Sequence, residues 1–205
     1  MLIEGDERCH SGPRHTGGVD DEQVQPGSLA EWRAWLAEHH GRGSGVWLVT
    51  WRAGSGGPRI GYEESVEQAL CFGWVDSKGR ALDAERTMLW FAPRKRGSGW
   101  ARTNKERIER LTAAGLMAPA GQAVIDAAKA DGSWTLLDDV ENLVVPDDLA
   151  AAFAAHPPAR EHWDAFPRSA RRATLEWIVQ AKRAETRTKR VAEAAEKAQA
   201  NERAR

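Results

Sequence analysis

The first hydrophobic pattern in the chain has the spacing of a helix. Trp32, Trp35 and Leu36 lie three and four residues apart and share one face, and Ser28 precedes them as a candidate N-cap. A second helical stripe over residues 62–73 ends at a glycine, which is the usual C-terminal signal. We therefore expect two helices in the first third of the chain.

Three stretches rich in β-branched and aromatic residues predict strands at 46–52, 74–82 and 87–92. The short turn at 83–86 favours an antiparallel hairpin between the last two. Pro93 ends the second of these strands, because proline cannot donate to a strand ladder. The sequence therefore predicts a small, mainly antiparallel sheet.

The pattern after residue 100 is helical, with glycine and proline at the boundaries. Thr103 and Glu106 match a capping box, and Ser169 has the position of an N-cap. From Ala184 onward the chain is rich in alanine and charge, which favours a helix with a fraying end. We expect an α+β fold, a small mainly antiparallel sheet packed by helices, with an all-helical C-terminal half.

The 205 residues are enough for one domain with a buried core. Residues 1–26 are acidic and lack periodic apolar positions, so we expect a disordered tail. Residues 27–192 form the predicted α+β domain, and residues 193–205 form the predicted fraying helical tail.

The net charge of −1 gives no global indication of nucleic acid or of an anionic membrane. The charges are nevertheless clustered. Residues 94–110 carry about +5, residues 131–151 about −6 and residues 168–205 about +6. These blocks predict internal ion pairs together with solvated faces.

The two cysteines, Cys9 and Cys71, provide no disulfide framework, which fits a reducing compartment. The first residues lack the basic and apolar regions of a signal peptide, and no apolar run approaches the roughly 18 residues of a membrane span. We expect a cytoplasmic protein with no membrane span.

Seven segments occur in order over roughly residues 28–192. They are 67–76 (EQALCFGWVD), 91–94 with 98–100, 104–107, 115–121, 127–134, 145–149 and 181–187. Together they resemble the YdeI/OmpD-associated, bacteriocin-protection family. Two positions differ from the pattern of that family, since Ala101 replaces a serine and Gly61 replaces a helix-capping Ser or Thr. The resemblance implies protection against bacteriocins or cationic antimicrobial peptides, and it implies no agreed catalytic mechanism.

A polar cluster around the hairpin and the following loop forms the first candidate ligand-binding site. An arginine beside an indole and a carboxylate can hold an anionic or planar ligand by bidentate hydrogen bonding and stacking. The alternative is a structural Arg94–Asp76 pair, with Trp100 as a core residue. The candidate residues are Trp74, Asp76, Arg94, Ser98, Trp100 and Asn104.

The second candidate is a predicted helix with two polar stripes, one with Lys182, Thr186 and Lys189 and the other with Arg183, Arg187 and Arg190. Such a stripe can meet phosphates or an acidic partner. The alternative is that this helix packs against the acidic region 131–148. No histidine pair has the i, i+4 spacing of a helical metal site, and no phosphate-loop or serine-nucleophile motif occurs, so the sequence indicates neither a metal nor a cofactor. The ten tryptophans favour a core role over base stacking.

Three functions are compatible with these residues. The leading hypothesis is a non-catalytic stress or antimicrobial-peptide protection protein that binds a peptide or a small anionic ligand. The alternative is an enzyme that acts on a small anionic substrate, with Asp76 as acid or base and Arg94 as anchor. The third is nucleic-acid binding by the basic C-terminal helices, although nucleic acid is the least expected partner. The sequence leaves open whether the chain is catalytic, which ligand it binds and whether it oligomerises.

Overall fold

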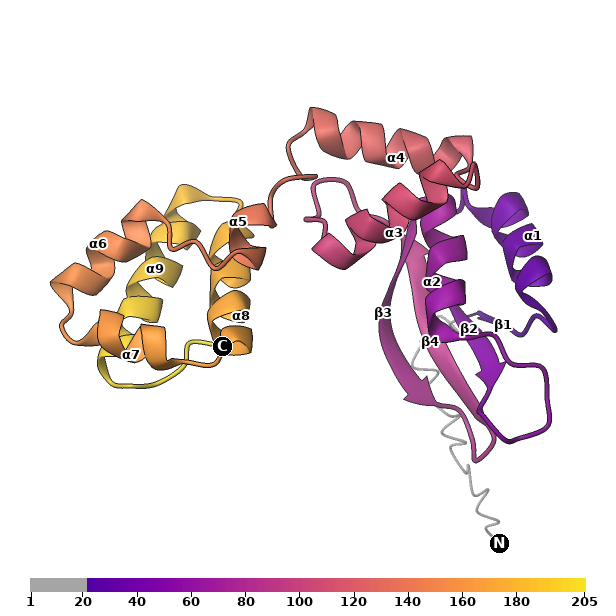
Figure 1. The fold of residues 1–205 in the computed structure, drawn as a ribbon, viewed down its shortest axis with the longest axis horizontal. Coiled ribbons are helices and arrows are strands. Elements are labelled where there is room, and N and C mark those ends of the chain that lie inside the picture. The colour runs from indigo at the N-terminus through magenta and orange to yellow at the C-terminus, as the bar shows by residue number, and fades with distance from the viewer. Residues whose placement is uncertain (1–21) are drawn as a thin grey trace, which may run out of the picture.

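The computed structural model describes residues 22–205, and they form the predicted α+β fold (Figure 1). The strands are β1 (Gln23–Val24), β2 (Val46–Trp51), β3 (Trp74–Ala81) and β4 (Arg86–Pro93). The helices are α1 (Leu29–His39), α2 (Tyr62–Cys71), α3 (Arg102–Ala113), α4 (Pro119–Ala130), α5 (Asp138–Glu141), α6 (Asp147–Ala155), α7 (Ala159–Ala165), α8 (Arg168–Val179) and α9 (Ala184–Gln199). The predicted disordered tail lies outside the described residues, apart from 22–26.

The sheet has the strand order β1-β2-β4-β3. β2 and β3 both pair antiparallel with β4, which confirms the three predicted strands and the hairpin. The Asp83 carboxylate accepts hydrogen bonds from the backbone N–H groups of Glu85, at 2.9 Å, and Arg86, at 2.7 Å, and so closes the hairpin turn. β1 pairs parallel with β2, and its two residues are too few to show a periodic signal in the sequence.

Helices α1 and α2 cover one face of the sheet and form the first hydrophobic core with it. The indoles of Trp32 and Trp74 are almost fully buried, and each donates its N–H to a backbone carbonyl, of Ser65 at 3.1 Å and of His40 at 3.0 Å. Backbone carbonyl groups therefore satisfy the indole N–H groups of these two buried tryptophans. Trp74 is a core residue in this arrangement.

A second hydrophobic core is formed by α5 to α9, and Figure 1 shows the two cores as two lobes with α5 at their boundary. Ala194, Ala195 and Ala198 of α9 and the terminal Ala204 are buried in this core. The segment 193–205, predicted as a fraying helical tail, is helical as far as Gln199 and contributes these buried alanines. Its small side chains allow α9 to approach α6 and α7 closely, so a helix with few large apolar residues is still held by packing.

Two of the three predicted N-caps are wrong. Ser28 caps α1 as expected, since its hydroxyl accepts the Glu31 N–H at 3.2 Å. α3 begins at Arg102, so Thr103 lies inside the first turn and has no capping bond. Pro167 precedes α8 with extended backbone angles, so this helix begins at Arg168 and Ser169 is also inside it.

The three charge blocks pair with one another as the sequence predicts. The Lys105 ammonium donates to Asp138, and Arg102 donates to Asn142 at 2.6 Å, and these contacts join α3 to the region of α5. Other pairs join the acidic block to the last basic block, namely Arg172 with Glu141 at 2.9 Å and Arg187 with Asp148 at 2.7 Å. The basic excess of the C-terminal helices is thus partly neutralised within the fold.

Candidate functional site

Arg94 follows β4 and is held in place by its backbone and by its side chain. Its N–H donates to the carbonyl of Gly73 at 3.0 Å, and its guanidinium donates to the carbonyl of Gly99. The guanidinium carbon lies 3.7 Å from the centroid of the Trp100 ring, and Trp100 is only 2% exposed. Arginine is therefore stacked on a buried indole at the start of the basic loop.

The charge of Arg94 has no carboxylate partner in residues 22–205. Its Nε is buried and lacks a hydrogen-bond acceptor. Burial lowers the pKa of the Arg94 guanidinium to about 10. A partly buried cation without a counter-ion is costly to a fold, so a bound anion would stabilise this position.

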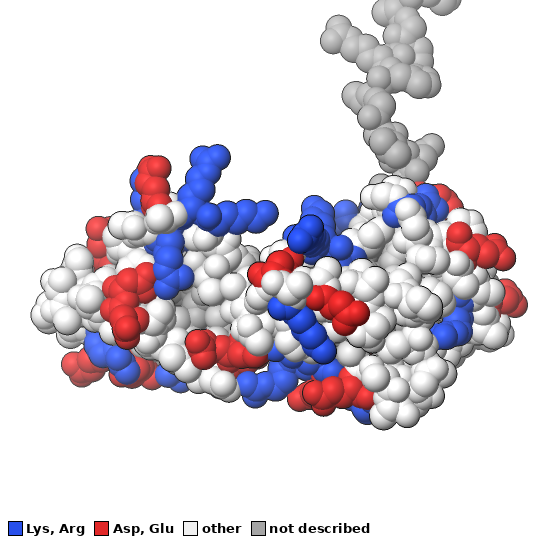
Figure 2. All heavy atoms as spheres, turned by 90° about the horizontal axis from the view of Figure 1, so that it is seen from above, with Lys and Arg blue, Asp and Glu red and all other residues white. Residues whose placement is uncertain are grey.

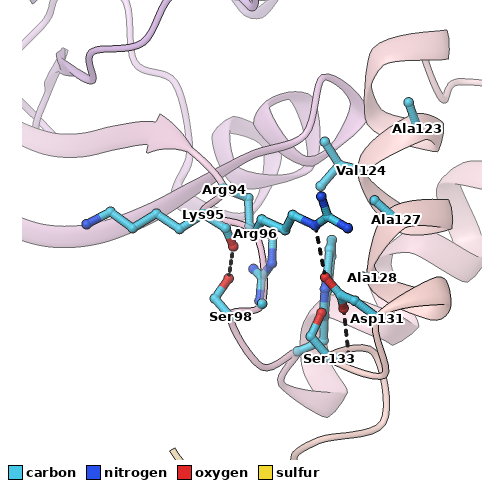
Figure 3. A pocket seen from close by; sticks show the side chains of 12 residues that line it. Arg94, Lys95, Arg96, Ser98, Ala123, Val124, Ala127, Ala128, Asp131 and Ser133 are labelled. Atoms are coloured by element: carbon cyan, nitrogen blue, oxygen red, sulfur yellow. Dashed lines mark hydrogen bonds and ion pairs between the residues drawn. The ribbon is translucent and has the colours of Figure 1, made fainter. Parts of the chain in front are cut away.

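A hollow of about 220 Å³ opens beside this guanidinium, and we call it the Arg94 hollow (Figure 3). One wall is the basic loop that runs from Arg94 to Ser98, and the other is the apolar face of α4. Figure 3 shows Arg96 reaching across to Asp131, at 3.5 Å, whereas Lys95 points away from α4. The residues of the α4 wall are Ala123, Val124, Ala127 and Ala128.

The position of α4 depends on a close backbone contact at Gly121. A Cβ at this position would lie 2.2 Å from the carbonyl oxygen of Cys71, at the end of α2. The Ala118 N–H donates to the same carbonyl at 3.1 Å. α4 is thereby seated against α2, and its apolar face becomes the wall of the Arg94 hollow.

Asp76 and Asn104 belong to a different polar network, which joins α2 to α3. The Asp76 carboxylate accepts a hydrogen bond from the Tyr62 hydroxyl at 2.9 Å, and the Asn104 side chain accepts one from Arg107 at 2.7 Å. Arg107 also pairs with Glu63 at 2.6 Å. Burial and the bond to Asp76 raise the pKa of Tyr62, and the bond from Arg107 lowers the pKa of Glu63.

The predicted cluster is therefore divided in the structure. Arg94, Ser98 and Trp100 line the Arg94 hollow, whereas Asp76 and Asn104 do not. No Arg94–Asp76 pair forms among the described residues, so the structural alternative also fails in that detail. The Ser98 hydroxyl donates to the carbonyl of Lys95 at 2.6 Å and stabilises the loop.

Lys182 lies in a second hollow of about 390 Å³, which we call the junction hollow. This hollow is built from the basic loop, from Leu136 and from the α8–α9 connection. Figure 2 shows Lys and Arg side chains on either side of the boundary between the two lobes. Arg187, in contrast, is engaged by Asp148 through two hydrogen bonds, at 2.7 and 3.0 Å, which lower the pKa of this carboxyl.

Comparison with known families gives two matches, one within each lobe. Residues 24–124 match a domain of unknown function, DUF8412. Residues 142–201 match the family described as bacteriocin-protection, YdeI or OmpD-associated. We call residues 142–201 the YdeI/OmpD-associated segment, after the family that they match. No curated protein and no solved structure matches the chain.

The YdeI/OmpD-associated segment contains Lys182 and Arg187, whereas Arg94 and its loop lie within the DUF8412 match. Of the segments that carry the resemblance, 145–149 and 181–187 fall inside the YdeI/OmpD-associated match. The junction hollow therefore takes residues from both matched parts of the chain.

Sequence reasoning missed Lys95, Arg96 and the α4 wall. The two basic residues belong to the basic block 94–110, but no local sequence signal indicates that α4 lies across the Arg94 hollow from them. Among residues 22–205 no three His, Cys, Asp or Glu side chains gather as they would around a metal ion. In the same range, no helix has the length and apolar character needed to cross a membrane.

Proposed function

We propose that this protein protects cells against bacteriocins without catalysing a reaction, by binding a small anionic ligand in the Arg94 hollow. The family match of residues 142–201 supports the protective role. The position of Arg94 supports the ligand, because its partly buried guanidinium lacks a carboxylate partner in the described chain and borders an open hollow. A carboxylate or phosphate would satisfy it by charge-assisted hydrogen bonds.

The charges around the hollow favour an anion over a cationic peptide. Arg94, Lys95 and Arg96 all belong to its lining, and Asp131 is its single acidic member. A cationic antimicrobial peptide would be repelled at this position. Protection would then follow from the bound anion or from a complex that it stabilises.

The enzyme alternative has less support. It requires Asp76 as acid or base beside Arg94, and the Asp76 carboxylate is instead bonded to Tyr62 in the α2–α3 network. Nucleic-acid binding by the C-terminal helices also has less support, because Arg172 and Arg187 are engaged by carboxylates. No structural observation specifically favours the enzyme alternative or the nucleic-acid alternative.

The test uses a bacteriocin-sensitive strain that lacks the protein and is complemented with wild-type chain, Arg94→Met or Arg94→Lys. We expect Arg94→Met to lose protection and Arg94→Lys to retain it in part, because lysine keeps the charge but not the bidentate geometry. Arg160→Met is the matched control, since Arg160 is exposed and pairs with Asp164 on the same helix. A folded Arg94→Met variant that protects as well as wild type would refute the proposal.

Ligand binding is tested in parallel on the full chain with acetate and inorganic phosphate. The indole N–H signal of Trp100 in a nitrogen–proton spectrum reports on the hollow, because Arg94 stacks on this ring. We expect saturable shifts in wild type and none in Arg94→Met. An unchanged Trp100 signal in wild type with both anions would contradict anion binding at this site.

A further inference from the structure

Three hollows adjoin one another at the boundary between the two lobes. The Arg94 hollow and the junction hollow share the loop residues 95–98. The junction hollow shares Leu136 and Val179 with a third hollow of about 190 Å³. We call this third one the valine hollow, because Val140 and Val144 line it together with Leu175 and Ile178. We call the three hollows together the trough, because each shares lining residues with the next.

The chemical character of the trough changes from one end to the other. At the basic end, Lys95 and Lys182 are exposed, and neither ammonium has an ion-pair partner within the described chain. No acidic residue lines the junction hollow. At the other end the lining is mainly aliphatic apart from Asp139 and Arg187, and Val144 is 48% exposed although it is a large hydrophobic residue.

We infer that the trough binds an anionic amphiphile, a small molecule with one carboxylate-type or phosphate-type head group and an unbranched hydrocarbon tail. This inference rests on the proposed function, because the head group is the anion that Arg94 binds. Lys95 and Lys182 line the adjoining junction hollow and add positive charge around the head group. The tail runs past Leu136 and Val179 toward Val144.

The aliphatic end favours a hydrocarbon over an acidic peptide. A peptide in this end would bring backbone N–H and C=O groups that need hydrogen-bond partners. Side chains such as Val140, Val144 and Ile178 cannot provide them. A hydrocarbon tail has no such requirement, and it removes the exposed surface of Val144 from water.

Binding is measured by calorimetry on the full chain with butanoate, octanoate and dodecanoate, kept below their micelle concentrations. We expect the affinity to rise about fourfold for each methylene that enters the aliphatic end, since that factor corresponds to the burial of one methylene. Dodecylammonium has the same tail with the opposite charge, and it should bind at least about tenfold more weakly than dodecanoate.

Two variants separate the head from the tail. Val144→Asp should weaken dodecanoate binding at least about tenfold and leave butanoate binding unchanged, because it places a charge beside the tail. Leu116→Asp is the matched control, since Leu116 is similarly exposed, at 42%, and lies outside the trough. Arg94→Met should weaken both carboxylates.

The outcomes are distinguishable. Butanoate binding that depends on Arg94 but does not strengthen with chain length would overturn the amphiphile and leave the proposed function intact. Dodecanoate binding that Val144→Asp and Leu116→Asp weaken equally would overturn the placement of the tail. Failure of both carboxylates to bind would overturn the amphiphile and the anion site together. Equal binding of dodecylammonium and dodecanoate would exclude the anionic head group.

Discussion

The guanidinium of Arg94 lies 3.7 Å from the centre of the Trp100 ring, and no carboxylate in the described chain neutralises it. The indole face offers an electrostatic partner that is weaker than a carboxylate. The stack therefore holds the arginine in one orientation without neutralising its charge. This combination distinguishes Arg94 from Arg172 and Arg187, which are held by acidic partners.

Replacement of Arg94 should remove ligand binding without lowering the free energy of unfolding. Arg94→Met keeps an aliphatic stem over Trp100 and removes the unpaired charge. We expect its free energy of unfolding to equal that of wild type or to exceed it by about 1 kcal/mol. Urea unfolding measures this difference. A loss of more than about 2 kcal/mol would mean that the guanidinium is required for folding.

The close contact at Gly121 should be intolerant of a single methyl group. Gly121→Ala places a carbon against the carbonyl oxygen of Cys71, and we expect destabilisation of about 1–3 kcal/mol in urea unfolding. Gly43 is the matched control, because a Cβ at that position meets nothing within 4 Å. Equal stability of Gly121→Ala and Gly43→Ala would contradict the seating of α4 on α2.

The packing of α9 can be tested with two alanines of the same helix. Ala195 is completely buried and Ala192 is exposed. Ala195→Leu should destabilise the protein by about 1–3 kcal/mol through overpacking, whereas Ala192→Leu should change stability by less than about 0.5 kcal/mol. Thermal unfolding of both variants distinguishes a packed terminal helix from a fraying one, in which the two changes would have the same effect.

The paired carboxylates predict a loss of stability in acid. Hydrogen bonds from Arg172 hold the pKa of Glu141 below its ordinary value of 4.5, and those from Arg187 hold the pKa of Asp148 below 3.8. The unfolded chain therefore takes up these protons first as the pH falls. The contribution to stability is complete above the ordinary values and is lost as the pH falls through the lowered ones.

Urea unfolding between pH 7 and pH 3 checks this prediction. Glu141→Gln should cost about 1–2 kcal/mol at neutral pH and flatten the acid dependence. Glu185→Gln is the control, because the Glu185–Lys189 pair is exposed on both sides. If the two variants have the same pH dependence, the Glu141–Arg172 pair does not carry the effect.

The sequence predicts the helices and strands of this protein better than the tertiary contacts between them. The strands and most helices follow from local periodicity, and Ser28 follows from its position before a hydrophobic stripe. The Arg94–Trp100 association was also within reach, because a short loop joins the two residues. The separation of Asp76 from Arg94 was not, because Tyr62 competes for that carboxylate through a contact between α2 and β3.

The α4 wall shows the same limit. Gly121 carries no sequence signal for a contact with Cys71, which lies fifty positions earlier in the chain. From the local sequence, a glycine within a helix indicates only low helix propensity. Here its missing side chain permits a tertiary contact.

The contacts of α3 with the α5 region have a consequence for how the protein responds to its surroundings. Lys105 meets Asp138 and Arg102 meets Asn142 through polar groups, and electrostatic attraction of this kind weakens as the Debye length shrinks from about 10 Å at 0.1 M salt to about 3 Å at 1 M. We therefore expect higher ionic strength to weaken the Lys105–Asp138 contact between the lobes.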